Sequence, residues 1–205
     1  GKPLLQHTVE ILKEKGIDSI VMVVSHKKEQ IMDFFGDGKK FGLHIDYVNQ
    51  ENPKGGTADA VRYSESKIIG DKFLLVYGDN VFDSKTIDEM LKKQGRYDGV
   101  LALKEMEDVS RYGVVEVKRD KVIGIKEKPE KAVSKLVLAG LFVLPSDIFE
   151  AIRKTKLSSR NEYELTDAIQ ILINEGHDFG FVKIEGFWID PRDKKELELA
   201  EQFVE

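Results

Sequence analysis

The chain has 205 residues, of which 41% are hydrophobic and 34% charged, with a formal net charge of −5. This size suits one domain with a substantial core, and the slightly acidic balance excludes the broad basic field that general nucleic-acid binding requires. The absence of cysteine excludes disulfides and a thiol nucleophile and is compatible with a cytoplasmic protein, and no apolar run approaches membrane-spanning length, so no membrane partner is expected.

The first half of the chain alternates between helix and strand patterns. Pro3 suits the first turn of a helix that ends at Gly16, and its apolar positions repeat at helical spacing. The elements predicted after it are a strand at 20–24, a helix at 27–35, a strand at 43–48, a helix from 57, a strand at 73–77 and a helix that Ser84 caps. Because alternating strands and helices are joined by right-handed crossovers, we expect a largely parallel sheet.

The pattern changes after Gly99. The predicted elements are a strand at 100–103, a hairpin of 115–117 and 122–125, a strand at 136–144, a helix from 145 to about 153, a helix around 165–172, a strand at 179–184 and a final helix that contains Leu197 and Ala200. No internal repeat or linker interrupts them. The sequence therefore predicts one mixed α/β domain over residues 1–205.

A candidate metal ligand follows the predicted strand at 73–77. This apolar run stops abruptly at Gly78, Asp79 and Asn80. Ligands of open α/β sheets bind beyond the carboxyl ends of strands, and a carboxylate there suits Mg²⁺, which prefers hard oxygen ligands. The alternative interpretation is an ordinary turn in which Asp79 caps a helix.

The segment from Gln50 to Thr57 is a candidate nucleotide-binding loop. Gly55 and Gly56 precede a predicted helix, so their backbone N–H groups can approach an anion or the edge of a base. The amide of Gln50 has both a donor and an acceptor, which suits it to reading a nucleobase edge. A glycine-rich loop that merely connects two elements is the alternative.

Two further polar positions follow predicted strands. Lys128 is a compact cation suited to phosphate, and Glu127 beside it can accept hydrogen bonds from hydroxyl groups. A solvated, charged turn is the alternative. Asp190 follows the only tryptophan, Trp188, and can share a metal ion with Asp79; the alternative there is a core tryptophan beside a helix-capping aspartate.

The sequence lacks the patterns of several other enzyme classes. The four histidines are scattered without the spacing of zinc ligands. No serine has the surroundings of a nucleophile elbow, and no Walker-type Gly-Lys-Ser/Thr occurs. Nothing in the sequence therefore points to a zinc enzyme, a serine hydrolase or a P-loop protein.

Eight segments occur in a fixed order along essentially the whole chain: GKPLLQHTVEIL, QENPKGGTADAV, FLLVYGDN, RYGVVEV, KEKPE, LAGLFVL, RNEYELTDAI and GFWID. Together they resemble the sugar-1-phosphate nucleotidylyltransferases, the NDP-sugar pyrophosphorylases. The resemblance implies a Rossmann-like, three-layer αβα fold with a mostly parallel mixed sheet, of the nucleotide-diphospho-sugar transferase type. It also implies in-line attack by a glucose- or N-acetylglucosamine-type sugar-1-phosphate on dTTP or UTP, with release of pyrophosphate and with Mg²⁺ as cofactor.

The resemblance also assigns roles to single residues. It implies base and nucleotide contacts for Gln50, Gly56 and Thr57, Mg²⁺ binding for Asp79 and Asp190, sugar contacts for Gly113, Glu127 and Gly140, and sugar-phosphate binding for Lys128. Asp79 and Lys128 are the residues expected to act in catalysis, which in this family rests on positioning and electrostatics. Glu162 and Asp167 match an acidic segment to which we assign a mainly structural role.

The sequence departs from the family pattern in two places. The family opens with a strand and a glycine-rich loop that ends in basic residues, whereas this sequence starts at a point that resembles the following helix. We therefore expect an N-terminally incomplete domain, or a natural variant with altered chemistry, that lacks a central strand and the main phosphate cradle. The exposed sheet edge would favour homo-oligomers. The second departure is Asp190-Pro191-Arg192-Asp193, where the family has an Asp followed by a Gly-Thr type turn.

Two functions of different classes are open at this point. The first is a nucleotidyltransferase whose chemistry is impaired by the lack of the loop. The second is a non-catalytic nucleotide-sugar binding or regulatory domain that retains the pocket.

Overall fold

A computed structural model describes residues 2–191 and 194–204, so Arg192 and Asp193 lie outside the described residues. Its strands are β1 (Ser19–Val24), β2 (His44–Asn49), β3 (Lys72–Val76), β4 (Val81–Phe82), β5 (Gly99–Glu105), β6 (Gly113–Lys118), β7 (Lys121–Glu127), β8 (Leu136–Pro145), β9 (Phe179–Lys183) and β10 (Trp188–Ile189). Its α-helices are α1 (Leu4–Glu14), α2 (Lys28–Phe35), α3 (Thr57–Tyr63), α4 (Lys85–Lys93), α5 (Ile148–Lys154), α6 (Leu165–Asn174) and α7 (Lys194–Val204). Within these described ranges, no helix is long and apolar enough to cross a bilayer.

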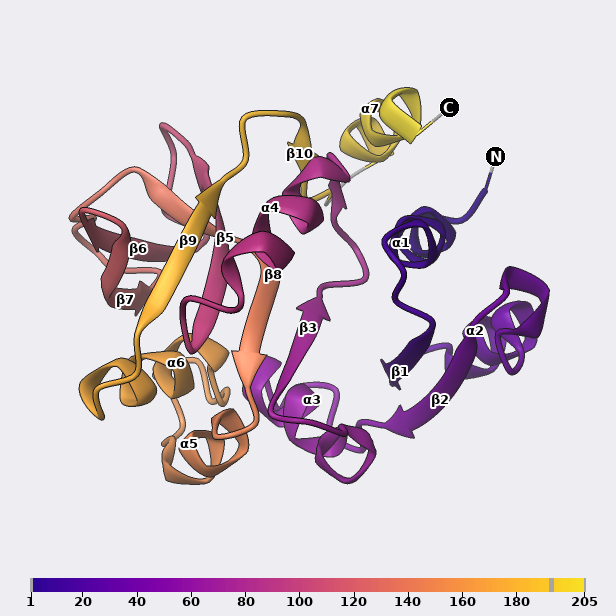
Figure 1. Ribbon diagram of the computed structural model, residues 1–205, viewed down its shortest axis with the longest axis horizontal. Helices are drawn as coiled ribbons and strands as arrows, with labels where there is room; N and C mark the ends of the chain where they lie inside the picture. Colours follow the sequence, from indigo (N-terminus) through magenta and orange to yellow (C-terminus); the bar gives the residue numbers. More distant parts are fainter. Residues whose placement is uncertain (1, 192–193, 205) are drawn as a thin grey trace.

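Six strands form the main sheet, in the order β3-β8-β5-β9-β7-β6 (Figure 1). Every residue of β8 is buried. This strand pairs antiparallel with both β3 and β5, whereas β5 pairs parallel with β9. The structure thus confirms the α/β class and the mixed sheet. Antiparallel pairs nevertheless predominate over the parallel pairs that the alternation predicts, because β8 inserts between β3 and β5 in the opposite direction.

Helices cover both faces of the main sheet, which gives the expected three layers. Leu101 and Leu103 of β5 belong to a core shared with α3, α5 and α6. Val100 and Ala102 belong to a second core, which includes residues of α1 and α4. Since successive side chains of a strand point to opposite faces, one buried strand supplies both cores.

β1 and β2 form a separate parallel pair, with α1 and α2 beside it (Figure 1). The buried residues of this part form a third, smaller core, which consists of Val9, Met22, Val24, Phe35, Leu43 and Ile45. Within the described residues, one edge of β1 and one edge of β3 have no partner strand. The strands are therefore divided among three sheets, the third being the short β4–β10 pair, and β1 and β3 belong to different sheets.

One predicted helix cap is wrong. Ser84 makes no side-chain capping bond. Asp83 Oδ1 instead accepts a hydrogen bond from Lys85 N at 3.0 Å. A carboxylate is favourable beside the N–H groups that begin α4, so Asp83 takes the capping role.

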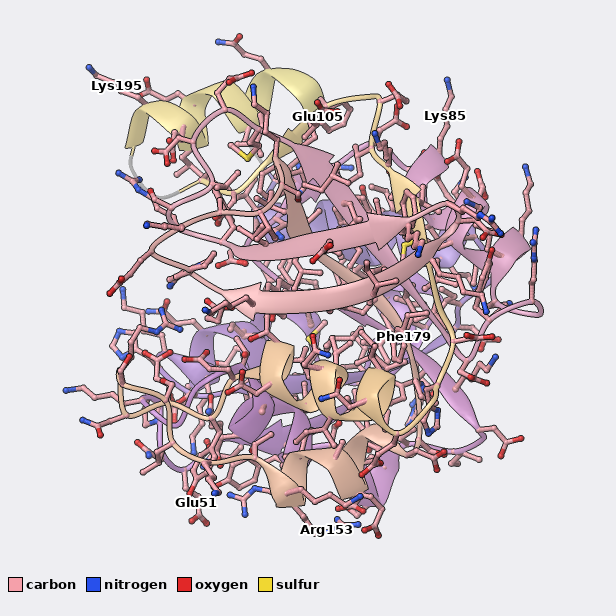
Figure 2. The ribbon with its side chains drawn as sticks, turned by 90° about the vertical axis from the view of Figure 1, so that its left-hand side faces the viewer. Glu51, Lys85, Glu105, Arg153, Phe179 and Lys195 are labelled. Carbon is pink, nitrogen blue, oxygen red and sulfur yellow. The ribbon has the colours of Figure 1, made fainter. Side chains whose placement is uncertain are left out.

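Charged side chains of both signs extend from the surface around the β6–β7 hairpin and the helices below it (Figure 2). Many of them are paired: Arg153 lies 2.8 Å from Glu65 and 2.7 Å from Glu150, and Lys121 lies 2.7 Å from Asp178. Because these pairs are exposed, each contributes less than about 1 kcal/mol to stability.

Candidate active site

The first part of the candidate site is the polar loop after β2, which we call the Gln50 loop (residues 50–59). Gln50 extends the strand, since its backbone N–H donates to Val24 O at 2.9 Å. Its side-chain Nε2 donates to Gly56 O at 3.3 Å and to Asp59 Oδ2 at 3.1 Å. Asp59 is only 5% exposed, and its Oδ1 accepts from Arg62 at 2.6 Å. The Gln50 amide is therefore held in one orientation by the protein itself.

Gly56 lies where the chain has no room for a side chain. Its φ of +91° is strained for any other residue, and a Cβ there would lie 2.5 Å from Tyr163 O. Backbone hydrogen bonds fasten this segment in place: Tyr163 N donates to Gly55 O at 2.8 Å, and Ala58 N donates to Tyr163 O at 2.9 Å. The Gln50 loop is thus attached to the segment that precedes α6.

Thr57 and Tyr77 connect the loop to β3 and β8. Thr57 Oγ1 accepts from Leu165 N at 3.0 Å, and its hydroxyl is also hydrogen-bonded to that of Tyr77. Burial raises the pKa of Tyr77, so its phenol stays neutral. Tyr77 N donates to Gly140 O at 2.9 Å. Gly140 has a φ of +77°, and a Cβ there would overlap Asn80 Nδ2, so this glycine is required by the packing beneath Asp79.

The pairing of β4 with β10 brings the two candidate metal ligands toward each other. Ile189 is opposite Val81 in this antiparallel pair, so Asp190 follows the paired segment directly and Asp79 precedes it by two positions. Two carboxylates suit a hard cation such as Mg²⁺, which usually takes its remaining ligands from phosphate and water. Among the described residues, no group of three or more His, Asp or Glu could hold a metal ion. A cation here would therefore depend on oxygen atoms of a ligand.

Asn80 and Trp188 anchor that strand pair to the main sheet. Asn80 Nδ2 and Trp188 Nε1 both donate to Ala139 O in β8, each at 2.8 Å. The indole also packs edge-on against Tyr112, with ring centroids 5.6 Å apart. The tryptophan is thus a structural anchor, as the alternative interpretation of this segment predicts. Asp190, however, does not directly precede α7, which begins at Lys194.

Glu127 and Lys128 lie at the end of β7, opposite Gly113 at the start of β6. A Cβ at Gly113 would lie 3.3 Å from Glu127 Oε2, so the glycine leaves room beside the carboxylate. Lys128 Nζ is 3.8 Å from Glu127 Oε1, and the Glu127 side chain is 21% exposed. Burial, followed by the nearby Glu164, raises the pKa of Glu127, while Lys128 and Arg160 act in the opposite direction. Glu127 is therefore not part of a fully solvated turn.

Arg160 is a cation in this region that sequence reasoning did not single out. Its Nη2 donates to Glu164 Oε1 at 2.8 Å, to Glu162 at 3.0 Å and to Glu127 at 3.4 Å. Glu164 is 2% exposed and also accepts from Ser158 Oγ at 2.8 Å. We call Arg160 with these three carboxylates the Arg160 cluster. In the sequence, the feature that indicates this cluster is the pair of glutamates two and four positions after Arg160.

The hydroxyl of Thr166 is buried close to the Glu127 carboxylate, where it acts to lower the pKa of that carboxyl. Thr166 is 6% exposed. Its methyl would lie 2.8 Å from a Cβ at Gly113.

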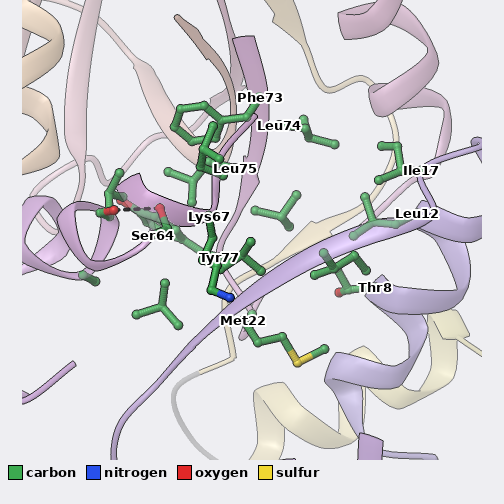
Figure 3. Close-up of a pocket in the computed structure, with 18 of the residues that line it drawn as sticks. Thr8, Leu12, Ile17, Met22, Ser64, Lys67, Phe73, Leu74, Leu75 and Tyr77 are labelled. Carbon is green, nitrogen blue, oxygen red and sulfur yellow. Dashed lines mark hydrogen bonds between the residues drawn. The ribbon is translucent and has the colours of Figure 1, made fainter. Parts of the chain in front are cut away.

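A cavity of about 920 Å³ separates β1 from β3 (Figure 3). Apolar side chains face it from several elements, among them Leu12 of α1, Met22 of β1 and Leu74 of β3. Gln50 and Asp79 also line it. The same cavity thus adjoins both the unpaired strand edges and the polar residues of the candidate site.

A line of contacts joins three of the predicted site residues, Gln50, Gly56 and Glu127, whereas Asp79, Asp190 and Gly140 lie outside it. Gln50 contacts Gly56, Gly56 packs against residues 162–163, and Arg160 joins Glu162 to Glu127. Asp59, Arg160 and Glu164 belong to this line but are absent from the sequence-based set. A lone buried carboxylate has no distinctive sequence pattern, so only the folded arrangement reveals Asp59 and Glu164.

Known proteins resemble this chain over its length. The model of a family described as nucleotidyl transferase matches residues 1–204. The low-salt glycan biosynthesis nucleotidyltransferase Agl11 of Haloferax volcanii is 34% identical over 100% of this chain and 58% of its own length. The UTP–glucose-1-phosphate uridylyltransferase AglF of the same organism is 35% identical over 97% of this chain and 83% of its own length.

Solved structures agree with this. The crystal structure of a putative glucose-1-phosphate thymidylyltransferase from Bacillus anthracis, in complex with a sucrose, has a TM-score of 0.85 and 26% identity, over 98% of this chain and 82% of that one. The chain spans between 44% and 58% of the length of several curated relatives that it matches.

Proposed function

Since the chain belongs to the nucleotidyl transferase family, we propose that the protein joins UTP or dTTP to a glucose- or N-acetylglucosamine-type sugar-1-phosphate, giving an NDP-sugar and pyrophosphate. One observation carries the proposal: the line of contacts from the Gln50 loop through Arg160 to Glu127. This line connects an amide suited to a base edge with groups suited to a sugar phosphate, which supports the proposal. The activities in the names of AglF and of the Bacillus anthracis protein support this choice of substrates. The absence of cysteine suits a cytoplasmic setting.

In the proposed reaction, an oxygen of the sugar phosphate forms a bond to the α-phosphorus of the NTP. The bond from that phosphorus to the bridging oxygen breaks, and pyrophosphate leaves. Lys128 holds the sugar phosphate through its ammonium group, and Glu127 accepts hydrogen bonds from sugar hydroxyls in the space left by Gly113. The buried Thr166 hydroxyl beside Gly113 and Glu127 is a further polar group for a hydroxyl-bearing ligand in that space. Catalysis rests on orientation and on charge stabilisation.

Asp79 and Asp190 are the proposed ligands of Mg²⁺, which when bound would neutralise charge on the phosphates. Their positions on either side of the β4–β10 pair support this assignment. Gln50, Gly56 and Thr57 are the proposed nucleotide contacts, and Gly140 allows the close packing of Asn80 and Tyr77 next to Asp79.

We also propose that the cavity between β1 and β3 is the place of a further strand, as the resemblance to the family implies. The two unpaired edges and the apolar lining of the cavity support this. Fusing a strand and a glycine-rich loop of the pattern with which the family opens ahead of Gly1 should raise the melting temperature. The same fusion with two prolines in the strand should not, because proline cannot pair within a sheet. Equal melting temperatures for both fusions would contradict the proposed strand.

Pyrophosphate release tests the proposed activity. The chain and this fusion are each incubated with UTP or dTTP, glucose-1-phosphate and Mg²⁺, with Asp79→Asn as the inactive control. Sustained release that depends on the sugar phosphate supports the proposal and excludes a purely binding domain. Nucleotide-sugar binding without release from either protein favours the binding domain, and the absence of both binding and release contradicts both functions.

A further inference from the structure

The amide orientation of Gln50 is fixed by chemistry. Its Nε2 faces the carbonyl oxygen of Gly56 at 3.3 Å and the carboxylate of Asp59 at 3.1 Å. Both of these oxygens are acceptors. Rotating the amide by half a turn would place Oε1 against two other acceptor oxygens, so only one orientation is favourable.

Asp59 is a firmly held support for that amide. Its side chain is buried, and Arg62 donates to its other oxygen at 2.6 Å. It lies in the first turn of α3, where backbone N–H groups favour a carboxylate. A Cβ at Gly55 would overlap the carboxylate, so the glycine is what lets Asp59 reach Gln50.

Because Gln50 Nε2 already donates to Gly56 O and to Asp59, the group of this amide that remains for a ligand is the acceptor Oε1. Its Oε1 receives no hydrogen bond within residues 2–191 and 194–204, and Gln50 lines the cavity. Six residues further on, the N–H of Gly56 donates no hydrogen bond within that same part of the chain. The loop therefore carries one acceptor, on Gln50, and one donor, on Gly56, that no described residue uses.

That pair of groups distinguishes two kinds of nucleobase. Uracil and thymine present an N–H next to a carbonyl, as does guanine, and these match an acceptor beside a donor. Cytosine and adenine present a ring nitrogen that accepts next to an amino group that donates. Against the Gln50 loop, the second kind would bring acceptor to acceptor and donor to donor.

We propose that Asp59 is a specificity-determining positioning residue: by holding the Gln50 amide, it makes the loop select bases with an N–H beside a carbonyl over cytosine and adenine. This rests on the proposed function, because it takes a base to be the ligand of Gln50. Asp59 acts through Gln50 and does not touch the nucleotide.

The test compares UTP with CTP, which differ only at the edge in question. Affinities are measured by calorimetry with Mg²⁺ for the wild-type chain, Asp59→Asn and Arg62→Met. The wild type should prefer UTP by about 100-fold, since each of two mismatched polar contacts costs about tenfold. In Asp59→Asn the new amide can face Gln50 with either its oxygen or its nitrogen, so the preference should fall below about tenfold.

Arg62→Met is the matched control, because it removes the other partner of Asp59 and leaves the contact with Gln50. Its ratio of UTP to CTP affinity should equal that of the wild type. If circular dichroism shows that Asp59→Asn does not fold, Gln50→Leu replaces it and should lose the preference in the same way. A merely structural role of Asp59 would lower both affinities and leave their ratio unchanged.

The outcomes separate the two claims. Equal UTP and CTP affinities in the wild type, or an unchanged ratio in Asp59→Asn, overturn the role of Asp59 and leave the proposed function intact. No binding of either nucleotide to the wild-type chain or to its fusion with a strand and glycine-rich loop overturns the proposed function, and this inference with it.

Discussion

The Gln50 loop and the Arg160 cluster organise their polar groups in different ways. In the loop, backbone hydrogen bonds and one buried carboxylate, Asp59, hold a neutral amide in a fixed direction. In the cluster, one guanidinium is shared among three carboxylates, of which only Glu164 is fully buried. The loop is therefore suited to recognition by hydrogen-bond direction, and the cluster to recognition by charge. In both, a buried carboxylate holds a less buried polar side chain, Gln50 in the loop and Arg160 in the cluster.

The largest expected effect on stability comes from a comparison of two glycines, Gly56 in the Gln50 loop and Gly113 beside the Arg160 cluster. Gly56→Ala should lower the free energy of unfolding by about 3 kcal/mol, because its Cβ would meet the backbone of Tyr163 at a strained φ. Gly113→Ala should cost about 1.5 kcal/mol, since its Cβ would meet side-chain methyl groups that can shift. Urea unfolding measures both.

Gly95→Ala is the control for these glycine variants, because a Cβ there has no neighbour within 4 Å. It should change the free energy of unfolding by less than about 0.5 kcal/mol. A larger loss for Gly113→Ala than for Gly56→Ala would mean that the loop is the more adaptable of the two regions.

The second prediction concerns the buried support of the cluster. Glu164→Gln should lower the free energy of unfolding by about 2 kcal/mol, because it leaves Arg160 without its buried charged partner. Glu162→Gln, whose side chain is 36% exposed and lies 3.0 Å from the same guanidinium, should cost less than about 0.5 kcal/mol. Equal effects in thermal or urea unfolding would show that burial does not distinguish the two carboxylates.

The third prediction assigns a ligand to each region. Lys128→Ala should weaken glucose-1-phosphate binding by about tenfold, the size of one charge-assisted contact at a half-exposed site. Free UTP should bind as before, because the Gln50 loop is untouched. Lys126→Ala, an exposed lysine on the same strand, is the control. Equal weakening of both ligands, measured by calorimetry, would remove Lys128 from the sugar-phosphate position.

The smallest expected effect is a pH dependence of the stability, which Glu127 of the Arg160 cluster contributes. The pKa of Glu127 is raised by burial and by Glu164, so folding favours its protonated form. That contribution to stability is present below the ordinary glutamate pKa and is lost as the pH rises through the raised pKa. Glu127→Gln should therefore gain stability relative to the wild type in the pH window that begins at the ordinary glutamate pKa of 4.5 and extends upward. A constant difference in urea unfolding at several pH values in that window would contradict the raised pKa.

Much of the fold follows from sequence patterns with a local physical cause. The apolar run of β8 and the turn at Arg119-Asp120 predict a buried strand and a hairpin, and both form. Strand order and direction depend on pairing between distant segments, so the position of β8 between β3 and β5 has no local signal. The family match confirms the resemblance drawn from the eight segments.

The candidate site was predictable only where glycine or strand-end patterns mark it. Gln50 and Asp79 stand out because each follows an apolar strand. Asp59 lies inside a helix, where a carboxylate usually faces solvent, and Arg160 lies in a segment rich in charge. Their importance comes from burial and from partners far away in the sequence, which a local pattern does not contain.

The division between β1 and β3 also affects which part of the molecule unfolds first. The part made of α1, β1, α2 and β2 has its own small core and shares no strand pairing with the main sheet in the described residues. Such a part can unfold by itself at a lower free energy than the whole. Native-state hydrogen exchange should therefore release the amides of β1 and β2 before those of β5 and β8, as two cooperative steps. The Gln50 loop is attached to both sides of the division, through Val24 and through Tyr163, so a nucleotide bound there would couple the two steps.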